Sequence, residues 1–271
     1  MKLSRALAGV AVGATLAFGS AAMAEYTEAP VADGGTVSGK ITFKGAVPPP
    51  KTAAFAKFPN PGYCDKTDSD GKGNRAVQEV KVGKDGALQD VVVYIEGIEK
   101  GKAFKFDGTD VKISGCKFLV QGGPSVMAGV VMKKAEIRVL NEDADPSDPK
   151  AATGVLHNPH SYEVAGANNT TIFNLPLPEK GQTIKKPVIL RKKDSTFMIE
   201  CDQHNYMQAF FMPISNPYYA VVGEDGSFTI SDVPPGTYEV YAWHPKLGKQ
   251  EANITVTAKG TAKADFAFAA K

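Results

Sequence analysis

The residue types best suited to chemistry stand close together at Cys201, His204 and Met207. Their spacing, Cys-x2-His-x2-Met, places a thiolate, an imidazole and a thioether on one short loop between two predicted strands, where all three can face one point. Copper suits these donors, since blue-copper sites combine one cysteine, two histidines and a weak axial methionine. Zinc rarely binds a thioether, and the chain lacks the Cys-x-x-Cys-His motif of a c-type haem. The spacing predicts a site for one copper ion, with a further ligand from elsewhere in the chain.

The first 24 residues have the layout of a cleavable export signal. Two basic residues open the chain, an apolar run too short to span a bilayer follows over residues 6–18, and small residues precede Glu25. We expect cleavage near Ala24 and Glu25. The sequence thus predicts a periplasmic or secreted protein without a membrane span.

Without this segment the charges of the chain balance. The segment holds two of the 31 basic residues and none of the 29 acidic ones, which leaves 29 of each sign. A nucleic-acid-binding domain normally has a basic face and a pI above about 9. The balance therefore argues against a nucleic-acid partner.

Three cysteines are an odd number for an exported chain, so at least one has no partner within it. Cys64 and Cys116 both lie in the N-terminal half, and oxidising conditions outside the cytoplasm favour a bridge between them. We interpret these two as a disulfide candidate. Cys201 is then the remaining thiol, and it is the one with histidine and methionine beside it.

Strand signals dominate the chain outside the export signal. Short alternating or β-branched runs are separated by glycine, proline, aspartate and asparagine, and no convincing ten-residue amphipathic helix is present. This pattern predicts an all-β, antiparallel β-sandwich architecture. The predicted strands cover residues 36–43, 90–95, 136–140, 188–191, 196–201, 208–213, 218–222, 227–230, 237–242 and 252–257.

Two stretches are too polar and proline-rich for strands, residues 48–74 and 141–154. We interpret both as surface loops. The second leads directly to the histidines at 157 and 160, so it is also a candidate lid or partner surface.

The two ends of the chain share a pattern. Gly35–Ile41 and Gln89–Tyr94, together with the late run Glu-Asp-Gly-Ser and the corner Pro-Pro-Gly-Thr-Tyr within 224–238, resemble the carboxypeptidase regulatory-like sandwich family. The physical content of the pattern is a hairpin and a turn into the next strand. The resemblance implies a split sandwich over residues 35–103 and 217–270.

The middle of the chain resembles a cupredoxin. The features that carry the resemblance are the strand and its Asn-Glu-Asp end at 136–143, the pair His157-Asn158, and the Cys-x2-His-x2-Met loop at 201–207 with an apolar strand after it. The short loop is like that of amicyanin and plastocyanin-type members. The whole chain is similar to exported cupredoxin-like proteins often labelled methylamine-utilisation proteins. This implies a cupredoxin Greek-key β-sandwich over residues 104–216.

The resemblance also implies roles for single residues. His157 would be the second imidazole ligand, and Asn158 after it would tie the two ligand loops together. About sixteen residues separate Asn141 from His157, more than in simple cupredoxins, so His160 stays open as an alternative ligand. The resemblance further implies that His204 turns a ring edge toward solvent, where a partner docks. His244, beside the only tryptophan, is interpreted as a packing residue.

The function implied is one-electron transfer between exported redox proteins, for instance a c-type cytochrome and a quinoprotein dehydrogenase. Multicopper oxidases and copper nitrite reductases need further histidine-rich metal sites, and a dinuclear centre needs two nearby cysteines. The chain has four histidines, and Cys201 has no cysteine near it in sequence. We therefore expect no enzyme activity. The alternatives are a copper chaperone or sensor and, third, a structural sandwich protein without metal.

Overall fold

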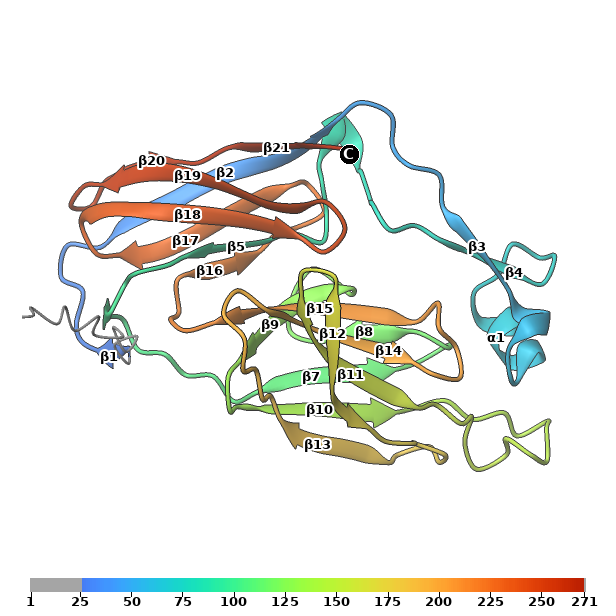
Figure 1. Cartoon of the computed structure of the whole chain (residues 1–271). Helices are drawn as coiled ribbons and strands as arrows, with labels where there is room; N and C mark the ends of the chain where they lie inside the picture. Colours follow the sequence, from blue (N-terminus) through green and yellow to red (C-terminus); the bar gives the residue numbers. More distant parts are fainter. Residues whose placement is uncertain (1–25, 271) are drawn as a thin grey trace, which may run out of the picture.

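The computed structural model describes residues 26–270, and their regular secondary structure is almost entirely strand (Figure 1). The predicted all-β class is confirmed: over these residues the chain has one short α-helix and two turns of 3-10 helix. The predicted export signal, residues 1–24, lies outside the described residues. Within residues 26–270, no helix combines the length and apolarity that crossing a membrane requires.

The elements follow one another closely along the chain. The helical ones are η1 (Phe55–Lys57), α1 (Pro61–Thr67) and η2 (Lys84–Gly86). The strands are β1 (Thr27–Glu28), β2 (Gly35–Lys44), β3 (Lys51–Ala54), β4 (Asn74–Val77), β5 (Val92–Ile95), β6 (Lys100–Gly101), β7 (Thr109–Ile113), β8 (Phe118–Val120), β9 (Ala128–Met132), β10 (Glu136–Asn141), β11 (Pro159–Ala165), β12 (Asn168–Asn174), β13 (Thr183–Pro187), β14 (Thr196–Cys201), β15 (Gln208–Ile214), β16 (Tyr219–Val221), β17 (Ser227–Val233), β18 (Gly236–His244), β19 (Gly248–Val256), β20 (Thr261–Lys263) and β21 (Phe266–Ala269).

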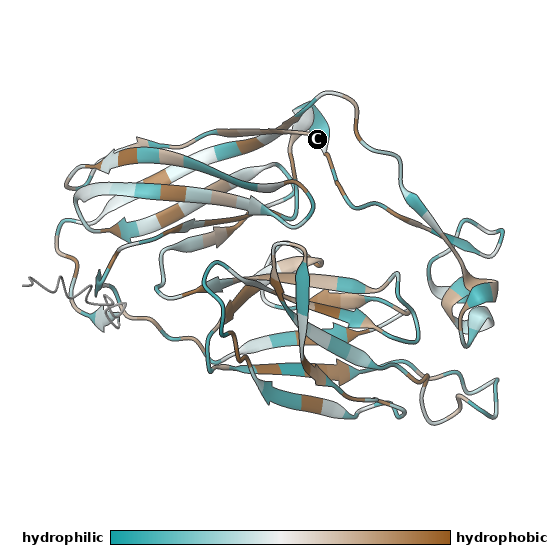
Figure 2. Cartoon of the chain, in the orientation of Figure 1, coloured by the Kyte–Doolittle hydropathy of each residue, from teal (hydrophilic) through white to brown (hydrophobic). Residues whose placement is uncertain are grey.

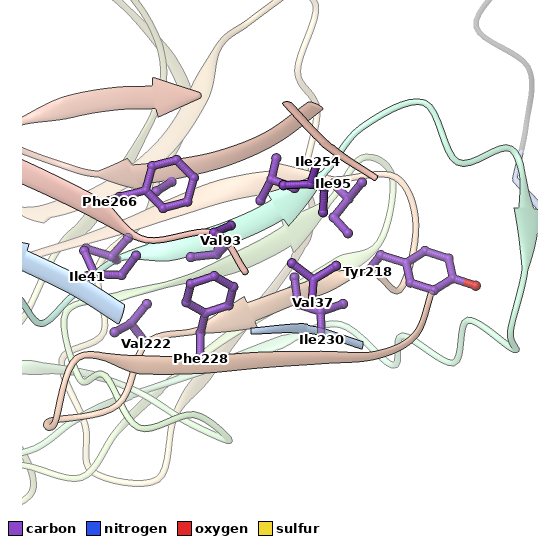
Figure 3. Packing of buried hydrophobic residues seen from close by; sticks show 14 of the residues in the cluster. Val37, Ile41, Val93, Ile95, Tyr218, Val222, Phe228, Ile230, Ile254 and Phe266 are labelled. Carbon is purple, nitrogen blue, oxygen red and sulfur yellow. The ribbon is translucent and has the colours of Figure 1, made fainter. Parts of the chain in front are cut away.

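The first sandwich joins the two ends of the chain. One sheet has the order β17-β2-β20, with β21 also paired to β2, and the other has the order β16-β5-β18-β19. Along β2 the burial alternates residue by residue, as expected for a strand with one face on a core. Val37, Ile41, Phe228 and Ile230 from one sheet meet Val93 and its neighbours from the other (Figure 3).

The second sandwich is built from the middle of the chain. Its sheets have the orders β13-β10-β7-β8 and β12-β11-β14-β15-β9. β14 and β15 pair antiparallel, with Phe197 opposite Phe211, and both side chains are fully buried. The hydropathy colouring shows apolar stretches within the strands of this sandwich and polar residues in the connections around them (Figure 2). Because β14 ends at Cys201 and β15 begins at Gln208, this core holds both ends of the predicted ligand loop in place.

The two sandwiches share an apolar contact. Tyr94 and Tyr241 of the first sandwich stack with ring centroids 5.3 Å apart, and they belong to one cluster with Phe210 and Met212 of β15. The ammonium of Lys246 lies 4.5 Å from the centroid of the Phe210 ring. The first sandwich thus packs directly behind the strand that follows the ligand loop.

Residues 46–79, which we call the arm, leave the first sandwich and reach the second. Between β2 and η2 the chain forms β3, η1, α1 and β4, and among residues 26–270 β3 pairs with β4 alone. Figure 1 shows this unit beyond the end of β14, away from its own sandwich. Helix α1 begins with Pro61, whose fixed φ suits the first helical position. The surface loop expected over 48–74 is therefore wrong in part, because Phe55 and Cys64 are buried in the core of the second sandwich.

One predicted strand is also wrong. Residues 188–191 are not in a strand, although Val188 and Leu190 are buried and Ile189 between them is exposed. Strand β13 ends at Pro187, opposite the first residue of β10, and beyond that point Val188 faces the turn at Lys134, whose φ is +70°. The alternation is present, but no partner strand continues alongside it.

Candidate copper centre

The ligand loop is a tight turn closed by its own backbone. The His204 amide donates to the Cys201 carbonyl at 3.1 Å, and the Met207 amide donates to the His204 carbonyl at 2.8 Å. The Cys201 amide donates in turn to the Met207 carbonyl at 3.2 Å. Cys201 and His204 are fully buried and Met207 is 2% exposed. The structure thus places all three predicted residues of the loop in the interior.

His157 completes the group from another part of the chain. A bridge to Leu177 fixes its backbone, with hydrogen bonds of 3.2 and 2.7 Å. The Cys201 sulfur lies 3.8 Å from Nδ1 of His157 and 3.8 Å from Nδ1 of His204. One donor atom from each of the three lies within 4.8 Å of the others, and all three residues are fully buried.

His160, the alternative ligand, is not part of this group. Strand alternation turns its side chain to the other face of β11 from the buried residues Pro159 and Ser161. Its ring stacks on Tyr162 at 4.1 Å, and its nitrogens contact Asp202 at 3.0 Å and Thr171 at 2.8 Å. The structure brings His157, and not His160, to Cys201.

Asn158 joins the two ligand loops. Its amide donates to the Cys201 sulfur at 3.4 Å, and its carbonyl accepts from the Asp202 amide at 3.0 Å. Its side-chain amide lies 3.4 Å from the Asp202 carboxylate. These contacts fix the sulfur relative to the loop that carries His157, which is the role expected for Asn158.

A buried carboxylate, Asp143, supports the group from behind. Oδ2 accepts from Nε2 of His157 and from the Cys116 amide, each at 2.9 Å. Oδ1 accepts from the Tyr63 hydroxyl at 2.8 Å and from the Gly115 amide at 2.6 Å. Burial alone raises the pKa of Asp143, but the hydrogen bonds from His157, Cys116 and Tyr63 outweigh it and hold the pKa below its usual value. The carboxylate is therefore ionised and fixes His157 with Nδ1 facing the sulfur.

The arm covers His204. Nε2 of His204 donates to the Pro59 carbonyl at 3.0 Å, and the Phe58 ring lies 6.3 Å from the imidazole, centroid to centroid. The Phe58 ring also meets Tyr206 edge-on at 4.9 Å. The expectation that His204 turns a ring edge toward solvent is wrong in this chain, because the arm occupies that side.

Burial sets the protonation of the donors. It lowers the pKa of His204 to about 4, helped by the nearby His157, so the imidazole is neutral at pH 7 and Nδ1 carries a free lone pair. It also raises the pKa of the Cys201 thiol, although amides from Asn158, Gln203 and His204 oppose this. A cation beside the sulfur would favour the thiolate at this position.

The other two cysteines form a disulfide bond next to the group. Cys64 of α1 is joined to Cys116, their Cα atoms 5.5 Å apart, as the cysteine count suggested, and Cys201 is the free thiol. Donor atoms of Cys64, Cys116 and His204 lie within 4.8 Å of one another. The disulfide therefore attaches the arm to the second sandwich directly beside His204.

His244 lies apart from this group, as expected. It is buried at the end of β18, and its Nδ1 accepts from the amides of Lys246 and Leu247. The residues that the sequence did not single out are Asp143, Tyr63 and the Pro59 carbonyl. Only Asp143 had a signal, in the Asn-Glu-Asp strand end, because the other two reach the site through the arm.

Comparisons with known proteins give distant likenesses. Residues 213–264 match a family model described as polysaccharide lyase family 4, domain II, which is not the carboxypeptidase regulatory-like family expected. No curated protein matches the chain. Among solved structures, the chain is similar to the copper-containing nitrite reductase of Thermus scotoductus SA-01, with 16% identity and a TM-score of 0.29, over 42% of this chain and 24% of that one.

Amicyanins match over a similar part of the chain. The amicyanin of Paracoccus versutus is 14% identical with a TM-score of 0.27, and the match covers 45% of this chain and 97% of that one. A reduced Cu(I) form of an amicyanin variant is 16% identical with a TM-score of 0.26, over 45% and 98% of the two chains. Likenesses this distant do not carry function, and the chain spans about a quarter of the nitrite reductase.

Proposed function

We propose that this chain is an exported protein that holds one copper ion through His157, Cys201, His204 and Met207 and works as a one-electron carrier. One observation supports this above all. A cysteine sulfur and two imidazole Nδ1 atoms from separate segments converge in a fully buried position, 3.8 Å from sulfur to each nitrogen, with a methionine on the same loop.

The donor set fits copper. Both histidines have Nε2 engaged, one by Asp143 and one by the Pro59 carbonyl, so both present Nδ1 to the sulfur. Hydrogen bonds of this kind on the far nitrogen fix ring orientation at metal sites. Copper with one cysteine, two histidines and a weak methionine supplies reversible one-electron chemistry. The chain contributes fixed donors and the exclusion of water.

Electron transfer fits this arrangement better than catalysis. Cys201, His157 and His204 have no exposed surface, so a substrate has no direct approach to the donors. An electron needs no such approach. A copper chaperone must pass its metal to a partner, and ligands covered by the arm are poorly placed for that exchange. The partners we propose are exported redox proteins, for instance a c-type cytochrome or a quinoprotein dehydrogenase.

The visible spectrum tests the proposal. Adding Cu(II) to the purified metal-free protein should give an intense blue thiolate charge-transfer band. Cys201→Ser and His157→Ala should abolish it, and His160→Ala is the matched control that should leave it in place. A colourless protein that binds only Cu(I) would favour the chaperone. An unchanged band in His157→Ala would contradict the ligand assignment.

A further inference from the structure

The arm covers the candidate copper centre on the side of His204. We propose that residues 46–79 must swing away before a metal ion can enter, and that the Cys64–Cys116 disulfide holds the arm shut afterwards. The part that concerns copper rests on the proposed function. The part that concerns the arm rests on the contacts between the arm and the second sandwich alone.

The arm closes the site through contacts on one side of His204. The Pro59 carbonyl occupies Nε2, and Phe58 lies beside the ring. Phe55 is 1% exposed and meets the Tyr206 ring edge-on at 5.8 Å. Tyr206 belongs to the ligand loop, so the arm covers the loop as well as the histidine. On this side the arm therefore blocks the approach of a metal ion to His204.

The arm can move without unpairing a strand of either sandwich. Its strands β3 and β4 pair with each other and with no strand of the two sandwiches. Opening would therefore break no ladder of the two sandwiches, although it would take Phe55 out of the core of the second. The polar links of the arm to the second sandwich are local, since they go to residues 115–117, to residues 143–147 and to His204.

The disulfide decides whether the arm opens. Besides it, the buried Arg75 links the arm to the second sandwich, since its guanidinium donates to the Gly115 carbonyl at 2.8 Å and also to that of Cys116. Tyr63 adds its hydrogen bond to Asp143. Contacts of this kind each contribute modestly, whereas a covalent bond cannot open by fluctuation. Cys64 and Cys116 are fully buried, so reductants have no access to the bond while the arm is closed.

An order of assembly follows. Copper enters while Cys64 and Cys116 are still two thiols. A disulfide-bearing oxidant of the oxidising compartment then exchanges with them, so that it is reduced to two thiols while Cys64 and Cys116 lose two electrons and two protons and form the bond that traps the metal. Once the bond is present, metal exchange is slow in both directions. This makes the arm an element of metal retention, in keeping with a carrier that must not lose its ion.

Alkylation of Cys201 in the metal-free protein tests the arm without copper. The variant pair Cys64→Ala/Cys116→Ala leaves Cys201 as the only thiol, as it is in the disulfide form. Its reaction with iodoacetamide should be at least about tenfold faster than in the parent protein, because local opening exposes the thiol. Lys57→Ala, an exposed change on the same arm, is the control and should react at the parent rate.

A second variant guards against misfolding. If circular dichroism shows that the alanine pair is unfolded, Cys64→Val/Cys116→Ala, which fills more of the space left by the disulfide, replaces it and should give a similar acceleration. Equal alkylation rates in parent and folded variants would overturn the proposal, as would rapid alkylation of the parent.

The rate of copper uptake distinguishes a failure of this proposal from a failure of the proposed function. In stopped-flow mixing with Cu(II), the blue band should appear at least about tenfold faster in the alanine pair, with the same final spectrum. Equal uptake rates in the parent and the alanine pair would overturn the proposal that the arm controls metal entry. If neither protein binds copper, the proposed function fails, while the alkylation result still decides whether the arm closes the site.

Discussion

Asp143→Asn barely changes the shape of the side chain, but we expect it to lower the free energy of unfolding of this protein strongly. The carboxylate is fully buried and accepts four hydrogen bonds, two on each oxygen. Asparagine is nearly isosteric, but one of its two positions carries an amide that donates. In either orientation of the asparagine side chain, an NH2 group takes the position of one carboxylate oxygen. That NH2 group is a donor, and it faces the two donors that the oxygen now accepts from.

The structure sets the magnitude. In the better orientation the amide replaces Oδ1, and the Tyr63 hydroxyl can rotate to accept from it. The Gly115 amide cannot, so a buried N–H loses its partner, at a cost of about 1–3 kcal/mol. The bonds from Cys116 and His157 pass from a charged to a neutral acceptor, which weakens each by about 1 kcal/mol. We expect a total loss of about 3–5 kcal/mol in the free energy of unfolding.

Urea unfolding of the metal-free protein at pH 7, followed by far-ultraviolet circular dichroism, measures this loss. Asp110→Asn is the matched control. Asp110 pairs with Arg138 on the surface, so the same chemical change should cost about 1 kcal/mol or less. Equal unfolding free energies for the two variants would refute the view that Asp143 organises the site.

Three further predictions concern other parts of the molecule. Burial lowers the pKa of His244 to about 4, so folding loses up to about 3 kcal/mol as pH falls from 6.5 toward 4, where the unfolded histidine takes a proton and the folded one does not. His244→Asn should reduce the pH dependence of the urea midpoint in that window, while His204, whose pKa is also lowered to about 4, still contributes. An unchanged slope would contradict this. Gly39→Ala should destabilise the first sandwich by about 2–3 kcal/mol in thermal melts, because the new Cβ would lie 2.0 Å from the Ala264 carbonyl oxygen. A melt within a degree of the parent would show that the strand shifts freely. The Cys64→Ala/Cys116→Ala pair should lose about 4 kcal/mol in urea, from the loop of some fifty residues that the bond closes, and a loss below about 1 kcal/mol would mean that the arm is ordered without it.

The features that could be predicted from the sequence are those whose residues lie close together in it. Cys201, His204 and Met207 lie on one loop, and the strand before it was predicted with the bounds that the structure has, residues 196–201. His157 lies far away in sequence and came only from a resemblance. Strand alternation then separates it from His160, since Pro159 and Ser161 face inward. That alternation is visible in the sequence only if the strand is known to begin at Pro159.

The missed strands had weak local signals. β12 reads Asn-Asn-Thr-Thr-Ile-Phe-Asn and is largely exposed, so it lacks the apolar alternation of a core strand. The opposite failure occurred at 188–191, where alternation is present but no partner strand is. A strand is defined by its neighbour, and pairing between distant segments is not written in the segment itself.

The arm shows the same limit at the site. Its sequence, with proline, glycine and lysine, indicates a surface loop, and nothing in it points to a histidine more than 140 positions later. Yet its position changes how an electron would leave under the proposed function. The edge of His204 does not reach solvent, and its Nε2–H bonds instead to the carbonyl of Pro59, an exposed residue. That hydrogen bond therefore links the buried ring of His204 to an exposed residue of the arm. Under the proposed function a redox partner would then dock on the arm, which connects the two sandwiches, and not on the loop at 201–207.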